Sequence, residues 1–326
     1  MIRSVVIAWS VLFVSLLAAA CSSDFEPDPP GWDGAAWMSR LDDDTPFAYV
    51  SIPGAHDAAT AGVTAWTQWT RTQDLDIAAL WNAGVRAFDL RPALVDGVMG
   101  IYHDKYSAHI TLKEVLLSLT RELSRHPEEF AIVLIRHERE ADGDNPAWGT
   151  TFLQIMDSFT DRMASWRPDL TVGAMRGKIL VLSRNSYEGG PVGGYIERWS
   201  HSKDLPDQQG ASLIGPDGAH GPLWVQDYYN PDDAETKWDA IRRLLDATAT
   251  SQHPGPVVIN HASGYLGSLP NYRKLAREIN PLAAKYISQC SSVTGIFMID
   301  FAGVDISKGI KVCGRELVRA VVENNF

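Results

Sequence analysis

Eight short apolar runs, rich in Val, Ile and Leu, recur along the chain and constrain its fold more than any other feature. Most of them lack alternation with polar residues, as expected of strands buried on both faces of a sheet. Segments with helical spacing lie between them, at 111–123, 238–248 and 275–288. The runs are Phe47–Ile52, Val85–Leu90, Val98–Tyr102, Ala131–Ile135, Ile179–Leu182, Leu223–Val225, Val257–Ile259 and Gly295–Ile299.

Strands that alternate with helices predict an α/β fold, a single (β/α)8 TIM-type barrel. An irregular or incompletely closed barrel is left open as a variant. A chain of 326 residues is long enough for two average domains, but one barrel also reaches about 250 residues or more. Because no break in composition divides residues 37–326, we expect one barrel domain there.

Charge and cysteine content exclude several classes of protein. The net charge of -11 argues against a nucleic-acid partner, because such proteins carry a basic footprint. Three cysteines are too few for a disulfide scaffold of this length. Cys290 and Cys313 either pair or remain as two buried thiols, and their spacing does not decide between the two.

The amino-terminal segment resembles a bacterial lipoprotein leader. Arg3 precedes an apolar stretch that is shorter than the roughly 20 residues of a membrane span and ends in small residues before Cys21. We therefore expect residues 1–20 to be a signal peptide, Cys21 to be lipidated and residues 21–36 to form a flexible tether. The protein would then be an exported bacterial lipoprotein, anchored in the outer membrane or at the cell surface. The alternative is an ordinary signal peptide followed by a chance cysteine.

Polar groups able to do chemistry follow each of the eight runs. In a parallel barrel the carboxyl ends of the strands meet at one rim, where barrel active sites lie. Asp89 and Arg91 are two residues apart, so they share one face of a strand. The groups, in chain order, are His56, Asp57, Asp89, Arg91, His103, Arg136, Arg184, Asp227, Tyr229, His261 and Asp300.

These residue types favour phosphodiester chemistry by acid–base catalysis. A carboxylate beside each of two imidazoles sets its tautomer and pKa, which gives a paired acid and base. Arginines at the same rim bind phosphate through fork-like hydrogen bonds. The sequence contains neither a Gly-x-Ser-x-Gly elbow nor a His-Glu-x-x-His motif.

Several motifs resemble those of the phosphatidylinositol-specific phospholipase C family, whose catalytic unit is the X-domain barrel. Residues 51–57, Ser-Ile-Pro-Gly-Ala-His-Asp, resemble its Ser-Ile-Pro-Gly-Thr-His-Asp signature. Residues 84–91 resemble its second-strand Gly-x-Arg-x-Phe-Asp-x-Arg block, and the spacing to His103 fits. Further matching segments follow in family order at 126–136, 176–184, 225–229 and 299–301.

The resemblance implies roles for two histidines. His56 would be the general base on the inositol 2-hydroxyl, with Asp300 as its carboxylate partner. His103 would be the general acid that protonates the diacylglycerol oxygen, oriented by Asp57. The expected products are diacylglycerol and a 1,2-cyclic inositol phosphate, formed by intramolecular attack, which has a high effective molarity.

The resemblance also implies how the phosphate and the ring are bound. Arg91 would stabilise the charge on the phosphate and would itself be held by Asp89. The inositol hydroxyls would contact Arg136, Arg184 and Asp227, with Tyr229 stacked on the ring. The substrate is an inositol phospholipid or a glycosylated inositol anchor. The chain departs from the family pattern at three positions: Ala55 and Ala58 replace a threonine and a serine, and Arg136 stands where metal-free bacterial relatives tend to carry lysine.

We expect no metal and no other cofactor. Calcium-dependent relatives surround the ion with oxygen ligands, whereas Arg91 and Arg136 place guanidinium groups at two of those positions. A metal-dependent glycerophosphodiesterase or sphingomyelinase-D-like barrel is one alternative. A surface lipoprotein that binds inositol lipids without catalysis is the other.

The expected partner is a lipid at a membrane surface, bound by a monomer. Trp66 and Trp69 follow the first predicted strand, and the segment 261–270 follows the seventh, so both would stand at the rim. The two tryptophans either contact lipid or pack beneath a lid.

Overall fold

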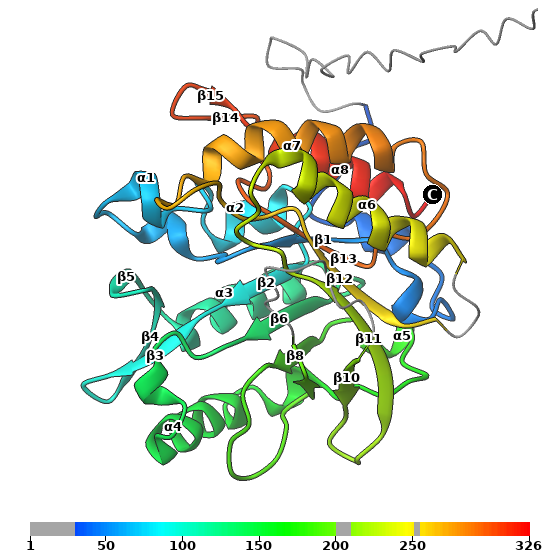
Figure 1. Cartoon of the computed structure of the whole chain (residues 1–326). Coiled ribbons are helices and arrows are strands. Elements are labelled where there is room, and N and C mark those ends of the chain that lie inside the picture. The colour runs from blue at the N-terminus through cyan, green and yellow to red at the C-terminus, as the bar shows by residue number, and fades with distance from the viewer. Residues whose placement is uncertain (1–29, 200–209, 251–254) are drawn as a thin grey trace, which may run out of the picture.

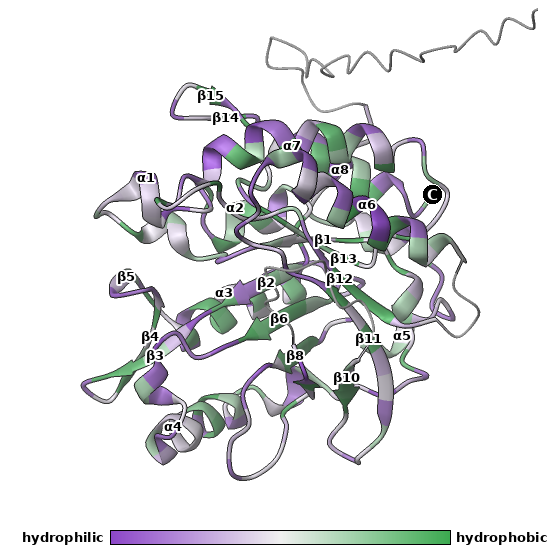
Figure 2. Ribbon diagram, viewed as in Figure 1, coloured by the Kyte–Doolittle hydropathy of each residue, from purple (hydrophilic) through white to green (hydrophobic). Residues whose placement is uncertain are grey.

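The computed structural model describes residues 30–199, 210–250 and 255–326. The predicted leader and Cys21 lie outside the described residues. Helices pack around a sheet that closes on itself (Figure 1). In Figure 2, helices α6 and α7 show both hydrophobic and hydrophilic bands, as amphipathic helices on a sheet do.

Nine strands form the closed barrel in the described part of the chain. Most neighbours are parallel, but β10 runs antiparallel to both β9 and β11, and pairing of β6 with β8 closes the ring. The predicted TIM-type fold is therefore confirmed, and the barrel is irregular but closed. In barrel order the strands are β6 (Ala131–Ile135), β2 (Ala87–Leu90), β1 (Ile52–Ala55), β13 (Ile296–Ile299), β12 (Val257–His261), β11 (His220–Gln226), β10 (Ala211–Ile214), β9 (Gly194–Glu197) and β8 (Ile179–Ser183).

The remaining strands belong to smaller pairings. The two-residue strand β7 (Met163–Ala164) flanks β8, and β14 (Ile306–Ser307) pairs with β15 (Ile310–Lys311). A separate antiparallel sheet consists of β3 (Pro92–Val95), β4 (Val98–His103) and β5 (Tyr106–Thr111).

The helices begin where the sequence supplies caps. Thr111 and Glu114 form a capping box at the start of the helix predicted there, and Asn271 caps another. The helices are α1 (Thr67–Thr70), α2 (Ile77–Asn82), α3 (Leu112–Arg125), α4 (Pro146–Asp157), α5 (Val172–Met175), α6 (Ala234–Thr250), α7 (Tyr272–Ile287) and α8 (Gly314–Glu323); short 3-10 turns span Trp37–Arg40, Phe47–Tyr49, Thr60–Gly62, Glu140–Asp142 and Thr160–Arg162.

Two of the eight predicted strands differ in the structure. Phe47–Tyr49 forms a 3-10 turn, and the strand begins only at Ile52. The ring of Phe47 packs edge-on against Phe130, and this contact holds the segment as a loop before the strand. Val98–Tyr102 lies in β4, whose partners are β3 and β5 and not barrel strands. His103, at the end of β4, therefore reaches the site from a hairpin outside the barrel.

Alternate side chains along the barrel strands pack in two different hydrophobic clusters, one inside the barrel and one between the barrel and the helices. In β6, Ile132 and Leu134 belong to the cluster inside the barrel, whereas Val133 packs with the surrounding helices. The fold thereby buries both faces of the strand, as the absence of polar alternation predicts.

The two ends of the described chain meet beside β1. Asn325 accepts a hydrogen bond from the Ser51 amide at 2.8 Å and donates to the Ser51 carbonyl at 2.9 Å, and the Ser51 hydroxyl lies 2.7 Å from Asn324. At the start, Arg86 donates to the carbonyls of Gly34 and Ala35. These contacts fix the strand that precedes His56.

Two further observations concern features raised by the sequence. The described cysteines, Cys290 and Cys313, do not form a disulfide. Within the described residues, every helix is too short or too polar to cross a bilayer.

Candidate active site

His56 follows the last residue of β1 and is held by a carboxylate from a distant strand. Its Nδ1 lies 2.8 Å from Oδ1 of Asp300, the residue after β13, and its Nε2 lies 3.2 Å from Nη2 of Arg91. Nδ1 therefore donates to Asp300, and Nε2 is the acceptor whenever the imidazole is neutral. Burial alone would lower the pKa of His56, but Asp57 and Asp300 raise it to about 9.

Arg91 is surrounded by acidic side chains. Its Nε lies 2.6 Å from Oδ1 of Asp57, and its Nη2 lies 3.4 Å from Oδ2 of Asp89. Burial would raise the pKa of Asp57, but Arg91 beside it lowers the pKa to about 2. The predicted contact between Asp89 and Arg91 is present, and Asp57 is the nearer partner.

His103 stands opposite His56 across Asp57. Oδ2 of Asp57 lies 3.5 Å from Nε2 of each histidine. The shortest contact of His103 is a different one, because its Nδ1 donates to the backbone carbonyl of Thr70 at 2.9 Å. Burial lowers the pKa of His103, an effect that Asp57 opposes.

A cavity of about 270 Å³ brings most of the predicted residues together. Behind it, Asp300 and Asp89 hold His56 and Arg91. Arg184 follows the last residue of β8 and is not among the residues that line the cavity; burial lowers its pKa to about 9 against the pull of Asp227. The predicted residues that line the cavity are His56, Asp57, Arg91, His103, Arg136, Asp227 and Tyr229.

One aromatic side chain contacts both Arg184 and Asp227. The ring of Trp199 lies 3.9 Å from the guanidinium carbon of Arg184, and its Nε1 donates to Oδ2 of Asp227 at 2.9 Å. His261, at the end of β12, meets the same ring edge-on at 5.7 Å. Burial lowers the pKa of His261 to about 3, so this imidazole stays neutral and is not a second general acid.

Spacing alone would allow a cation near Asp57. Ligand atoms of His56, Asp57 and Asp89 lie within 4.8 Å of one another. The guanidinium of Arg91 contacts both carboxylates, so a cation there would meet a fixed positive charge. Burial raises the pKa of Glu138, which lies 3.8 Å from Arg91, to about 7. This donor set fits an arginine better than calcium, which needs several free oxygen ligands.

Gln73 supports the site and was not predicted from the sequence. It is fully buried, donates to the carbonyls of His56 at 2.9 Å and Ile299 at 2.8 Å, and accepts from the Ala302 amide at 3.0 Å. It thus joins the ends of β1 and β13, which carry the base and its carboxylate. A lone glutamine after a loop gives no pattern that reveals this role.

An apolar cavity of about 520 Å³ adjoins the polar one. His103, Tyr265 and Tyr272 line both cavities. Trp66 and Trp69 stack at 5.1 Å on its far side, and 61% of Trp66 is exposed. Within the described residues, Trp66 is therefore not packed beneath a lid.

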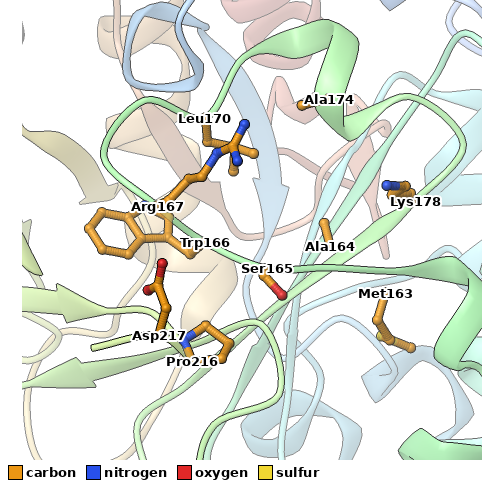
Figure 3. Close-up of a pocket in the computed structure, with 10 residues that line it drawn as sticks. All are labelled: Met163, Ala164, Ser165, Trp166, Arg167, Leu170, Ala174, Lys178, Pro216 and Asp217. Atoms are coloured by element: carbon orange, nitrogen blue, oxygen red, sulfur yellow. The ribbon is translucent and has the colours of Figure 1, made fainter. Parts of the chain in front are cut away.

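A further cavity, of about 390 Å³, lies near the amino end of β8, away from these residues (Figure 3). Ser165, Trp166, Arg167, Lys178 and Asp217 are among its lining residues. Its Arg167 is paired with Asp169 at 3.0 Å, and the cavity contains none of the predicted site residues. The carboxyl rim of the barrel is the better candidate for the chemistry.

Two bacterial enzymes are similar to the chain over most of its length. No protein-family model matches it. A 1-phosphatidylinositol phosphodiesterase of Staphylococcus aureus (strain Newman) is 27% identical over 290 residues, covering 82% of this chain and 88% of the relative. One from Listeria monocytogenes is 27% identical over 286 residues, covering 84% of this chain and 83% of the relative. The chain is a homologue of bacterial 1-phosphatidylinositol phosphodiesterases.

Solved structures of such homologues share the barrel. The phosphatidylinositol-specific phospholipase C of S. aureus aligns with a TM-score of 0.73 at 23% identity, over 88% of this chain and 97% of that chain. The enzyme of L. monocytogenes aligns with a TM-score of 0.70 at 22% identity, over 90% of this chain and 100% of that chain.

Proposed function

We propose that the protein is a phosphatidylinositol-specific phospholipase C. The observation that best supports this proposal is the arrangement of His56 and His103. Both line one cavity and contact Asp57, and Arg91 lies beside them. The named activity of the bacterial homologues is 1-phosphatidylinositol phosphodiesterase. A metal-dependent barrel phosphodiesterase would need oxygen ligands where Arg91 lies.

The geometry supports one sequence of proton movements. Nε2 of His56 takes the proton of the inositol 2-hydroxyl while that oxygen forms a bond to phosphorus. The bond from phosphorus to the glycerol oxygen breaks, and that oxygen takes a proton from His103 Nε2. Arg91 stabilises the negative charge on the phosphate, and Asp300 stabilises the protonated His56. The products are diacylglycerol and a 1,2-cyclic inositol phosphate.

The two adjoining cavities support an amphiphilic substrate. Arg136, Asp227 and Tyr229 line the polar cavity, which suits the inositol ring. Trp66 and Trp69 line the apolar one, which suits the diacylglycerol part. A glycosylated inositol anchor has the same phosphodiester and is the second substrate that we propose.

Phosphorus NMR of the products from phosphatidylinositol vesicles tests this function, with and without a chelator. We expect a cyclic phosphate signal in both samples, and no signal with His56→Ala, which still binds vesicles. If wild-type protein binds vesicles but releases no cyclic phosphate, the protein is a lipid-binding protein. A cyclic phosphate signal that the chelator abolishes would favour the metal-dependent alternative.

We further propose that Cys21 carries a lipid that anchors the protein to a bacterial membrane. The leader-like segment before Cys21 supports this proposal. Labelling cells with a radioactive fatty acid should mark the wild-type protein and not the Cys21→Ser variant. Equal labelling of both proteins would contradict the proposal.

A further inference from the structure

Three groups surround His103, and each meets a defined nitrogen. Its Nδ1 donates to the Thr70 carbonyl at 2.9 Å, so Nδ1 carries a hydrogen. Its Nε2 lies 3.3 Å from the hydroxyl oxygen of Tyr272 and 3.5 Å from Oδ2 of Asp57. Nε2 is therefore the nitrogen that exchanges a proton with a substrate.

Tyr272 is held rigidly in this place. It is the first residue of α7 and 5% exposed, and its ring packs edge-on against Tyr265 at 5.8 Å. The next residue, Arg273, is 3% exposed, donates to the Ser307 hydroxyl at 2.6 Å and lies 4.7 Å from the Phe301 ring. The start of the helix cannot shift without breaking these contacts.

We propose that Tyr272 is a positioning residue for His103: the Tyr272 hydroxyl, 3.3 Å from Nε2, holds the imidazole ring so that Nε2 faces the cavity in which the leaving-group oxygen binds. The inference rests on the proposed function, in which His103 protonates that oxygen. A hydroxyl both donates and accepts hydrogen bonds, so it accepts from the protonated imidazole and donates to the neutral one. Asp57 only accepts, and it is also paired with Arg91 at 2.6 Å.

The surroundings of Tyr272 keep it a hydrogen-bond donor. Burial, together with the charges of Asp57 and Asp300, raises the pKa of Tyr272 well above its ordinary value. The phenol therefore keeps its proton over the whole working range of pH. Its ring also forms part of the wall between the polar and the apolar cavity, close to where the leaving oxygen must lie.

The Tyr272→Phe variant tests the inference, because it keeps the ring and removes only the hydroxyl. Two substrates separate positioning of the acid from general damage to the site. Phosphatidylinositol has an alkoxide leaving group that needs a proton, whereas inositol p-nitrophenyl phosphate has a phenolate that leaves without one. We expect kcat for phosphatidylinositol to fall about 10-fold to 100-fold with KM unchanged, since complete loss of a general acid costs about 10²–10⁴. For the p-nitrophenyl substrate, we expect kcat within about twofold of wild type, because that step needs no acid.

Two further variants complete the experiment. Tyr286→Phe is the matched control, because it removes a hydroxyl of the same helix whose partner is Asp246, and both rates should stay near wild type. His103→Ala should lower kcat for phosphatidylinositol more than Tyr272→Phe does, and should again leave kcat for the p-nitrophenyl substrate nearly unchanged. Adding Tyr272→Phe to His103→Ala should cost nothing more, since the hydroxyl acts through the imidazole.

Other outcomes would overturn the inference. If Tyr272→Phe slows both substrates equally, the hydroxyl supports the site as a whole and not the acid. If it slows neither, the contact with His103 has no role in catalysis. If wild-type protein cleaves neither substrate, the proposed function itself fails, and this inference fails with it.

Discussion

At the scale of residues, Asp57 links two histidines that titrate far apart. The pKa of His56 is raised to about 9, and the pKa of His103 is lowered from its ordinary 6.5. Between these values the pair holds a single proton, and the form that has it on His103 and not on His56 supplies both the acid and the base that the reaction needs. Two histidines with opposite shifts can therefore work together at neutral pH.

The pH dependence of kcat/KM should consequently be bell-shaped. Above about pH 9 the pair loses its one proton, and the acid is missing. Below the lowered pKa of His103 both imidazoles are protonated, and the base is missing. Rates measured from pH 4 to pH 11 check this expectation.

Asp57→Asn provides the control for this profile. Asp57 raises the pKa of His56, so its replacement should move the basic limb to lower pH. A limb that stays near pH 9 in this variant would argue against His56 as its source.

The role of the Arg91 guanidinium can be tested by a single substitution. Its guanidinium contacts Asp57 and Asp89 together, which a lysine ammonium cannot do in the same geometry. We expect Arg91→Lys to lower kcat by about 10²-fold, comparable to losing an oxyanion donor. Added calcium should not restore the rate, and Lys178→Arg, outside the site, should leave it unchanged. Restoration by calcium would show that a cation does belong there.

At the scale of elements, short apolar runs in the sequence predict well where the parallel strands lie but predict poorly which strands pair with each other. Ala131–Ile135 is a strand with the predicted bounds, because its side chains are apolar on both faces. Val98–Tyr102 looks the same locally, yet it pairs in a hairpin, and no short run reveals which partner a strand will find. Strands β9 and β10 were missed because Gly194–Glu197 and Ala211–Ile214 each mix apolar with small or polar residues.

The candidate site was predictable to a similar extent. Residues at strand ends, such as His56 and Asp227, share a rim by topology alone. The groups that orient them come from elsewhere: Thr70 supplies a backbone carbonyl, and Tyr272 lies 169 positions from His103. Neither contact leaves a pattern in the sequence, because each depends on how α1 and α7 pack against the hairpin.

Gln73 allows a test at this scale, since it joins two strand ends. Gln73→Leu keeps the volume but removes three hydrogen bonds. The amide of Ala302 loses its acceptor, whereas the carbonyls of His56 and Ile299 each keep one other donor. An unpaired buried group costs about 1–3 kcal/mol, so we expect the free energy of unfolding to fall by at least about 2 kcal/mol. Urea unfolding measures this change, and kcat should fall as well.

The control for this variant is Gln154→Leu, on the exposed side of α4. A surface substitution should change the free energy of unfolding by less than about 0.5 kcal/mol. Equal effects of the two variants would contradict the role assigned to Gln73.

At the scale of the whole molecule, the three most exposed of the large apolar side chains in the described residues come from three different loops or short elements. Trp66 is 61% exposed, Leu269 66% and Ile306 63%, from α1, the loop before α7 and β14. In Figure 1, α1 and the β3–β5 sheet lie at the left of the molecule, and the β14–β15 hairpin lies above them at the upper left. This side borders the apolar cavity, which suits contact with a lipid surface.

Replacing Trp66 by alanine should weaken binding to phosphatidylinositol vesicles. A tryptophan buries about 200 Å² when it inserts, so we expect the dissociation constant to rise about 10-fold or more. Sedimentation with vesicles measures this change. Leu117→Ala, an exposed apolar residue on α3, should bind as wild type does. Equal weakening by both variants would indicate a general loss of fold.

The position of β1 between β2 and β13 sets when, during synthesis, the protein acquires activity. His56 is synthesised early, but Asp300 follows 244 residues later, and Asn325 follows 274 residues after Ser51, to which it is hydrogen-bonded. Until then β1 has no partner on one side, and His56 has no carboxylate on Nδ1. A nascent or prematurely ended chain that lacks Asp300 therefore has no carboxylate to hold the base, and we expect it to be inactive.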